Sequence, residues 1–203
     1  MGLCHDDHRH HGLSRLPQSG RGQWHGQPVE RPVIETERLL LRPHIANDFQ
    51  DCRAMWQDPA VMKYIGGIRA TEAEAWLRFL GYFGRWQIMR YGLFALIEKS
   101  SGQFMGEVGF SDFRRGLGPD FDPFHEAAWV LAAAGHGKGY ALEAMTAAQE
   151  WLDAKFSPDK TVCIINPENA PSISLAKKLG FRPTGEAVYN ENTVRLFERL
   201  RPE

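Results

Sequence analysis

The residues best suited to chemistry form a glycine-rich turn at positions 135–141. The turn reads Gly-His-Gly-Lys-Gly-Tyr-Ala, follows the apolar, strand-like run 126–131 and precedes the segment 141–152. Apolar side chains recur every three or four residues in that segment, which predicts an amphipathic helix. A strand-to-helix turn of this kind presents several backbone N–H groups at the positive end of a helix dipole. The spacing therefore predicts a phosphate-binding site.

Two common phosphate-binding motifs do not match this turn. A Walker A loop requires a glycine where this chain has Ala132, ahead of the Gly-Lys pair at 137–138, and Ser or Thr where it has Gly139. A dinucleotide-binding G-x-G-x-x-G pattern fails because Leu142 or Tyr140 occupies the place of its last glycine. Both nucleotide-binding interpretations are therefore excluded.

The turn resembles the pyrophosphate loop of the GNAT acetyltransferases, written roughly as Q/R-x-x-G-x-G/A. The match places His136, Gly139 and Ala141 at the defined positions of that motif. His136 stands where the family usually has Gln or Arg. The resemblance therefore implies a backbone cradle with less side-chain help to the pyrophosphate.

Two further segments extend the resemblance in the order found in the family. Residues 169–181 are similar to the family's N-x-x-S/A…K-x-G-F helix. Residues 36–43, Thr-Glu-Arg-Leu-Leu-Leu-Arg-Pro, are similar to the opening strand of the branch that includes the ribosomal-protein N-terminal acetyltransferases. Together the matches cover residues 33–201, which implies one N-acetyltransferase domain.

Length, composition and charge agree with a single globular enzyme. The chain has 203 residues, of which 43% are hydrophobic and 24% charged, as is typical of a soluble domain. A formal net charge of -1 gives no field that would attract nucleic acid or an anionic membrane. No apolar run approaches the roughly 18 to 20 residues of a membrane span. Three cysteines without C-x-x-C spacing predict reduced thiols and a cytoplasmic protein.

The N-terminal segment differs from the rest of the chain. Residues 1–32 contain five of the eight histidines and many glycines, and they lack both apolar periodicity and the apolar core of a signal peptide. We expect a flexible His/Gly-rich tail over 1–32 and a single acetyltransferase domain over 33–203.

From position 33 onward, strand and helix patterns alternate. Thr71 and Glu74 form a capping box that predicts the start of a helix ending near Arg90. The predicted strands cover 37–42, 93–98, 103–113, 126–131, 161–165, 182–189 and 193–200, and the predicted helices 47–57, 60–64, 71–90, 141–156 and 170–179. This pattern favours an α/β (α+β) sandwich in which helices flank a central sheet. The resemblance implies a mixed, mostly antiparallel sheet of about seven strands, with a splayed strand pair forming the acetyl-CoA cleft.

The resemblance implies acetyl-CoA as co-substrate and no metal. The backbone of 129–131 would pair with pantetheine, and the N–H groups of 137–141 would bind the pyrophosphate, where glycine lets the oxygens approach closely. Asn169 has two candidate roles, as a helix N-cap or as a polar contact to pantetheine. The expected cofactor contacts are Trp129, Val130, Leu131, His136, Gly137, Lys138, Gly139, Tyr140, Ala141, Asn169 and Ser172.

The expected chemistry is direct acetyl transfer to a primary amine in a ternary complex. A general base must remove a proton from the ammonium group, and Glu126 is the first candidate, with His125 as the neighbouring alternative. Many relatives carry a Tyr as general acid at the position of Ala176, so this chain departs from the pattern there. Ser172 matches a serine of the ribosomal-protein branch and is a candidate hydrogen-bond donor to the sulfur.

The acceptor stays open at the level of sequence. A protein or peptide N-terminus, a polyamine-like small amine and an aminoglycoside-type compound are all compatible, and the branch resemblance favours the first. We expect a monomer or homodimer with no nucleic-acid or membrane partner. The alternative to an active enzyme is a CoA-binding or regulatory module with weak chemistry, motivated by Ala176 and His136.

Overall fold

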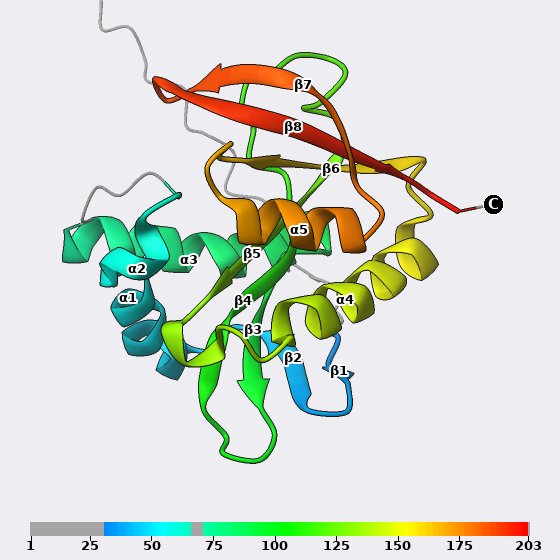
Figure 1. Ribbon diagram of the computed structural model, residues 1–203. Coiled ribbons are helices and arrows are strands. Elements are labelled where there is room, and N and C mark those ends of the chain that lie inside the picture. Colours follow the sequence, from blue (N-terminus) through cyan, green and yellow to red (C-terminus); the bar gives the residue numbers. More distant parts are fainter. Residues whose placement is uncertain (1–30, 66–70, 203) are drawn as a thin grey trace, which may run out of the picture.

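One eight-stranded sheet organises the protein, with strand order β1-β2-β3-β4-β5-β6-β8-β7 (Figure 1). The computed structural model describes residues 31–65 and 71–202. All neighbouring strands run antiparallel except β5 and β6, which are parallel. The strands are β1 (Ile34–Glu35), β2 (Leu39–Pro43), β3 (Leu93–Glu98), β4 (Phe104–Ser111), β5 (His125–Leu131), β6 (Lys160–Ile165), β7 (Arg182–Tyr189) and β8 (Asn192–Leu200).

This arrangement confirms the predicted mixed, mostly antiparallel sheet. The eighth strand is the two-residue β1, which is too short to show a periodic pattern in the sequence. The tail expected over residues 1–32 falls almost entirely on residues 1–30, which lie outside the described part of the chain.

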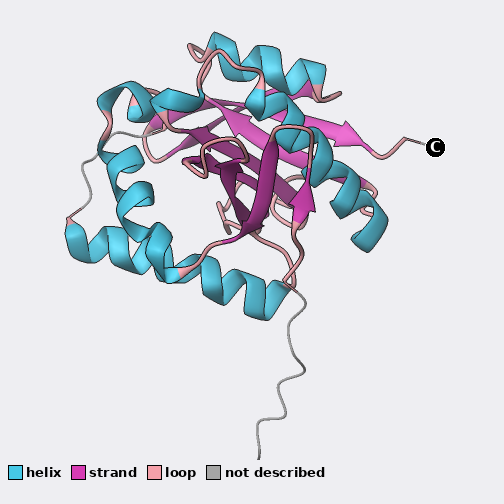
Figure 2. Ribbon diagram, turned by 90° about the horizontal axis from the view of Figure 1, so that it is seen from below, coloured by secondary structure: helices cyan, strands magenta, loops and turns pink. Residues whose placement is uncertain are grey.

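Helices cover both faces of the sheet (Figure 2). On one face, α1 (Phe49–Gln57), α2 (Pro59–Met62) and much of α3 (Glu72–Met89) build one buried apolar cluster. On the other face, α4 (Tyr140–Phe156) and α5 (Ala170–Lys178) pack on a second, larger cluster. Two short 3₁₀ turns, η1 (Ala46–Asp48) and η2 (Ala133–Gly135), precede α1 and α4. None of the helices in the described ranges is long and apolar enough to cross a bilayer.

The start of α3 shows how local sequence fixes an element. The Thr71 hydroxyl accepts a hydrogen bond from the Glu74 N–H at 3.3 Å, and the Glu74 carboxylate accepts one from the Thr71 N–H at 2.7 Å. Both bonds satisfy N–H groups that a helix start otherwise leaves unpaired. At the other end, Arg90 adopts the left-handed conformation with φ 65°. The predicted beginning and end of this helix are therefore confirmed.

The alternation of β5 sorts its side chains between the two faces. Ala127 and Leu131 lie in the cluster under α4, whereas Ala128 and Val130 pack against the cluster under α1 and α3. Because side chains alternate along a strand, Glu126 belongs to the α1/α3 face.

Close packing of β4 on β5 depends on a glycine. Gly106 has φ 144°, and a Cβ built there would lie 2.3 Å from the Val130 carbonyl oxygen. Any side chain at this position would push β4 away from the strand that carries Glu126.

The two central strands pair over a short stretch only. In the described residues, the β5–β6 ladder consists of His125 with Thr161 and Glu126 with Val162. Beyond these pairs β6 continues to pair with β8, whereas residues 127–131 of β5 pair with β4 alone. The result is the splayed strand pair expected from the family resemblance.

Candidate active site

The phosphate-type turn has the backbone that its glycines predict. It follows η2 and leads directly into α4, with Gly137 at φ 73° and Gly139 at φ 77°. These left-handed conformations favour glycine, since a Cβ there costs roughly 1–2 kcal/mol. A Cβ at Gly137 would contact nothing within 4 Å. Backbone conformation, and not crowding by the protein, is therefore what requires glycine at position 137.

The turn leaves a row of backbone donors unpaired. Among the described residues, the N–H groups of 137–142 have no protein acceptor, and the first bond of α4 runs from the Glu143 N–H to the Gly139 carbonyl at 3.2 Å. A helix start without a side-chain cap is a natural anion site, because its free N–H groups and its dipole act together. The arrangement can therefore hold a phosphate or pyrophosphate.

A clamp from the start of the sheet holds this turn in place. The Arg38 Nε donates to Glu143 Oε2 at 2.7 Å, and the Arg38 backbone N–H donates to Glu143 Oε1 at 2.9 Å. The Thr36 hydroxyl donates to the same Oε1 at 2.6 Å. Arg38 Nη1 also donates to the Lys138 carbonyl at 2.9 Å. The connection between β1 and β2 therefore fixes both the turn and the first turns of α4.

The side chains of two residues in the predicted phosphate-binding turn point toward the protein. The Tyr140 hydroxyl donates to Glu98, and Lys138 Nζ lies 3.4 Å from the Glu98 carboxylate. Hydrogen bonds from Ser101 and Tyr140 hold the pKa of Glu98 at about 2. Lys138 and Tyr140 therefore offer a ligand their backbone N–H groups, as part of the unpaired row at 137–142.

His136 engages the end of β5. Its Nε2 lies 2.9 Å from the Leu131 carbonyl, so the ring occupies one acceptor of the strand predicted to pair with pantetheine. The backbone of Trp129 and Val130 has no strand partner on the β6 side among the described residues.

The predicted contacts on α5 come together with β5. The Trp129 indole N–H donates to the Ser172 hydroxyl at 3.3 Å, and the Asn169 side chain accepts from the Ser172 N–H at 3.2 Å. Asn169 is thus the N-cap of α5, as one of its two predicted roles requires. The helix ends at Lys178, and Gly180 follows its C-cap in the left-handed conformation, with φ 86°. Ala176 is fully buried in the core, so this position offers no proton donor.

The candidate base Glu126 is buried and paired. It is 4% exposed, and Arg115 Nε lies 2.8 Å from each of its carboxylate oxygens. Burial raises the pKa of Glu126, while the hydrogen bonds and charge of Arg115 oppose that rise without cancelling it. Such a carboxylate is a stronger base than one in water and fits proton removal from an amine.

The alternative base lies on the opposite face of β5. The His125 ring is 4.5 Å from the Tyr91 ring and 5.6 Å from the Phe156 ring, centroid to centroid. Burial lowers the pKa of His125. The two candidate bases therefore point to different sides of the sheet, so an acceptor on one face reaches only one of them.

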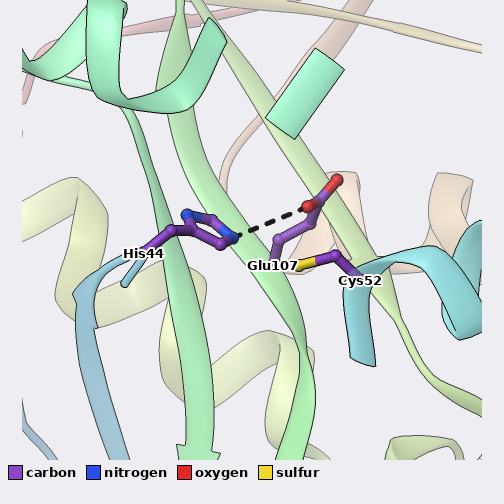
Figure 3. Close-up of side chains that lie close together, drawn as sticks. All are labelled: His44, Cys52 and Glu107. Atoms are coloured by element: carbon purple, nitrogen blue, oxygen red, sulfur yellow. Dashed lines mark ion pairs between the residues drawn. The ribbon is translucent and has the colours of Figure 1, made fainter. Parts of the chain in front are cut away.

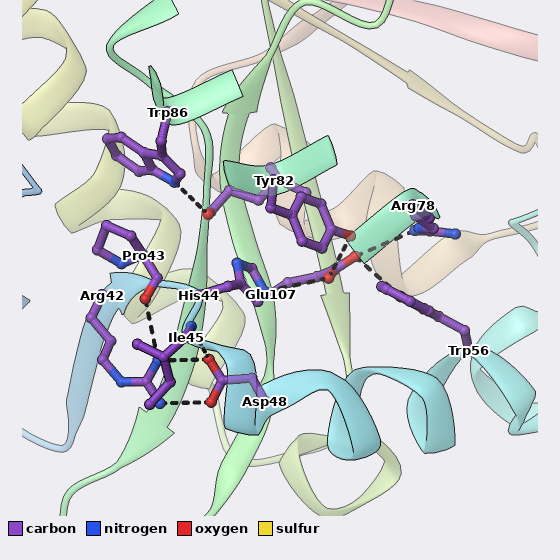
Figure 4. A network of polar contacts seen from close by, with 11 residues as sticks. Arg42, Pro43, His44, Ile45, Asp48, Trp56, Arg78, Tyr82, Trp86 and Glu107 are labelled. Carbon is purple, nitrogen blue, oxygen red and sulfur yellow. Dashed lines mark hydrogen bonds and ion pairs between the residues drawn. The ribbon is translucent and has the colours of Figure 1, made fainter. Parts of the chain in front are cut away.

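A second buried polar cluster lies between α1, α3 and β4, and sequence patterns did not indicate it. The ligand-type atoms of His44, Cys52 and Glu107 lie within 4.8 Å of one another (Figure 3). The Glu107 carboxylate accepts from the Tyr82 hydroxyl at 2.7 Å and pairs with Arg78 at 3.3 Å (Figure 4). Arg78 is the counter-ion of Glu107, so the negative charge of this carboxylate is balanced within the protein.

Sequence reasoning missed the residues that act through long-range pairing. Arg38 and Glu143 are 105 positions apart, and Glu98 and Tyr140 are 42 apart. A single sequence carries no signal for such pairs.

Comparisons with known proteins identify the family. The sequence matches the acetyltransferase (GNAT) domain family over residues 38–182. It is 28% identical over 152 residues to YnaD, an uncharacterized N-acetyltransferase of Bacillus subtilis (strain 168), a match that covers 75% of this chain and 84% of that protein.

Solved structures share the fold. A Bordetella pertussis protein assigned to the GnaT acetyltransferase family superposes with a TM-score of 0.75 at 37% identity, covering 83% of this chain and 99% of that one. The ribosomal-protein-S5-alanine acetyltransferase of Vibrio fischeri shares the fold, with a TM-score of 0.68 at 17% identity over 85% of this chain and 98% of its own. The chain therefore belongs to the GNAT acetyltransferase family and is an acyltransferase.

Proposed function

We propose that the protein transfers an acetyl group from acetyl-CoA to a primary amine by direct attack in a ternary complex. The observation that carries the proposal is the row of unpaired N–H groups at 137–142, placed between the open edge of β5 and the start of α4. The pyrophosphate would bind this row, and the helix dipole would add about 0.3–1 kcal/mol. Pantetheine, whose amides resemble a short strand, would pair with β5 at 129–131.

Glu126 would act as the general base. Its carboxylate accepts a proton from the acceptor ammonium, directly or through a water molecule. The neutral amine then attacks the thioester carbonyl carbon, and the C–S bond breaks as the C–N bond is completed. A backbone N–H of β5 is suited to stabilise the transient oxyanion.

The departing thiolate needs a proton or a hydrogen bond. Ser172 is the candidate donor, since its hydroxyl lies at the first turn of α5, within 3.3 Å of the Trp129 indole nitrogen on β5. The buried Ala176 leaves this part of the site without the tyrosine that many relatives use. The proton lost by the amine nitrogen in the tetrahedral intermediate balances the one gained by the thiolate.

Relatives of the same fold define the acceptor classes to test. The Vibrio cholerae spermidine N-acetyltransferase was solved with CoA and spermine, and AAC(6')-Ib with paromomycin and acetyl-CoA. We favour a peptide or protein N-terminus in the cytoplasm, because an α-amino group has a pKa near 7.7–8.0 and needs less help from a base than a lysine amine. The buried, reduced Cys52 and Cys163 agree with that setting.

The decisive experiment is a thiol-release assay with acetyl-CoA over a panel of N-terminal peptides, polyamines and aminoglycosides. We expect CoA release with one acceptor class and at least 100-fold slower turnover for Glu126→Gln, as is typical when a general base is removed. Calorimetric titration with acetyl-CoA is the control, and Glu126→Gln is expected to keep wild-type affinity. Tight binding without turnover on any acceptor would instead support the weakly catalytic CoA-binding module.

A further inference from the structure

The carboxylate of Glu126 is held by an arginine from outside its own strand. Arg115 lies on the loop between β4 and β5, and its Nη2 is 2.7 Å from Glu126 Oε1, in addition to the two Nε contacts at 2.8 Å. The arginine side chain is 17% exposed and the glutamate side chain 5%. A fork of this kind fixes the plane of a carboxylate and not only its charge.

The same guanidinium contacts two aromatic rings. Its Cζ lies 4.6 Å from the Phe113 ring centroid and 4.7 Å from that of Tyr189. Tyr189 ends β7 at a turn in which Asn190 and Glu191 both have positive φ, 47° and 64°. Arg115 therefore joins three segments: its own loop, the start of β5 and the β7–β8 hairpin.

The loop that carries Arg115 is itself anchored. The Asp122 carboxylate accepts hydrogen bonds from the Gly116 N–H at 3.0 Å and from the Gly118 N–H at 2.7 Å. These bonds close the loop on the residue next to Arg115. The arginine is thus placed by the fold, unlike a surface cation that happens to find a partner.

We propose that Arg115 is the positioning residue for the base Glu126. It keeps the carboxylate ionised and aligned toward the acceptor amine. Tyr189, which packs on the Arg115 guanidinium, couples this alignment to the β7–β8 hairpin. The inference rests on the proposed acetyltransferase function. Ser111 supports the location, since it pairs with Glu126 across β4 and β5. Its buried hydroxyl has no hydrogen-bond partner among the described residues. A water molecule or the acceptor amine is a natural partner for that hydroxyl.

The charges around Glu126 predict how its pKa changes when Arg115 is removed. Burial and the charges of Asp112 and Asp122 raise its pKa, and Arg115 is the cation that lowers it. Cys163 of β6 also lies close enough to feel the Glu126 charge, but burial raises the pKa of its thiol well above the ordinary range, so it stays neutral. Without Arg115, burial and the two aspartates remain, and each of them raises the pKa of Glu126.

The test compares pH profiles of kcat/KM for Arg115→Met, Arg115→Lys and Tyr189→Leu. A neighbouring cation typically lowers a carboxyl pKa by about 1–3 units, so the acid limb for Arg115→Met is expected to move up by about that much. Arg115→Lys, which keeps the charge but not the fork, is expected to shift it less, and Tyr189→Leu least. Arg195→Met is the control, since Arg195 lies in the β7–β8 hairpin but pairs with Glu186 and not with Glu126, and it is expected to keep the wild-type profile.

Two comparisons separate this inference from the function on which it rests. In the Glu126→Gln background, Arg115→Met is expected to add no further loss, because both changes act on one group. If Glu126→Gln impairs turnover but the acid limb stays in place for Arg115→Met and Arg115→Lys, the positioning role is refuted. If Glu126→Gln itself leaves turnover unchanged, the base assignment and this inference both fail. Wild-type acetyl-CoA affinity in each variant shows that the fold is retained.

Discussion

At the scale of single residues, backbone conformation decides what the site can bind. Gly139 has φ 77° and lies at the N-cap of α4, where no side chain caps the helix. A Cβ there would lie 3.6 Å from Arg38, which is ordinary contact, so the protein itself leaves room for a methyl group. What a methyl group would obstruct is the approach of an anion to the free N–H groups.

Gly139→Ala is therefore expected to weaken acetyl-CoA binding roughly tenfold, equivalent to about 1.4 kcal/mol. Gly180→Ala is the matched control, because Gly180 has φ 86° and a Cβ there meets only ordinary contacts near Arg199. Both changes are expected to cost about 1–2 kcal/mol of folding stability. Only Gly139→Ala is expected to alter the dissociation constant measured by calorimetry. Equal affinities in the two variants would argue against the anion site.

The glycines were recognisable in the sequence because their spacing between a strand and a helix is a local pattern. The orientation of the side chains between them was not. The side chains of Lys138 and Tyr140 both contact Glu98 on β3, while their backbone N–H groups stay in the predicted phosphate-binding row. Such choices depend on distant partners, which a local pattern does not contain.

At the scale of elements, the start of α4 depends on the segment before β2. Thr36 and Arg38 bind Glu143 from the first hairpin of the sheet, and Arg38 also binds the carbonyl of Lys138. Burial alone would raise the pKa of Glu143, but hydrogen bonds from Thr36 and Arg38 lower it overall. The carboxylate therefore stays charged at neutral pH, and Arg38 compensates a negative charge next to the anion site.

Arg38→Met is expected to weaken acetyl-CoA binding several-fold for two reasons that act in the same direction. The turn loses an anchor, and the Glu143 charge is left to repel the pyrophosphate. Lys99→Met is the matched control, since Lys99 is similarly exposed, at 42% against 44%, and its Nζ contacts Glu35 and the Thr36 carbonyl but not Glu143. Calorimetric titration of the two variants with acetyl-CoA measures the difference in affinity. An unchanged affinity for Arg38→Met would show that the clamp is not needed for binding.

Most elements were predictable from local signals, such as the Thr71–Glu74 capping box and the glycine at the end of α5. The order of the strands and the single parallel pair were not readable from periodicity and came from the family resemblance. β1 escaped prediction because two residues cannot display a period.

At the scale of the whole molecule, a fully buried polar cluster lies inside one of the two apolar layers. The His44 ring stacks on Tyr82 at 4.3 Å, and neither of its nitrogens has a hydrogen-bond partner in the described chain. It lines a pocket with Pro43 and Trp86. Burial lowers the pKa of His44, although the charge of Glu107 opposes this.

This burial makes stability depend on pH with a definite sign. A histidine whose pKa is lowered by folding binds protons more readily in the unfolded chain, so the free energy of unfolding falls as pH drops below about 6.5. The slope from one such group reaches at most about 1.4 kcal/mol per pH unit. His44→Phe, which keeps the ring on Tyr82, is expected to flatten this slope in urea unfolding between pH 7 and 5. His125→Asn is the comparison variant. Burial also lowers the pKa of that half-buried ring, so this change is expected to flatten the slope as well. A slope identical to the wild type in His44→Phe would contradict the assignment.

The short β5–β6 ladder has a consequence for how the molecule opens. Within the described part of the chain, two register pairs join strands β1–β5 to strands β6–β8, so side-chain packing under α4 and α5 carries most of that junction. Backbone that lacks ladder bonds exchanges its amide protons through small local openings. Within residues 127–131, deuterium uptake is expected to be faster at the amides that face away from β4 than at those that bond to it, and a strand-like ligand bound along this edge would slow that uptake and join the two halves into one cooperative unit.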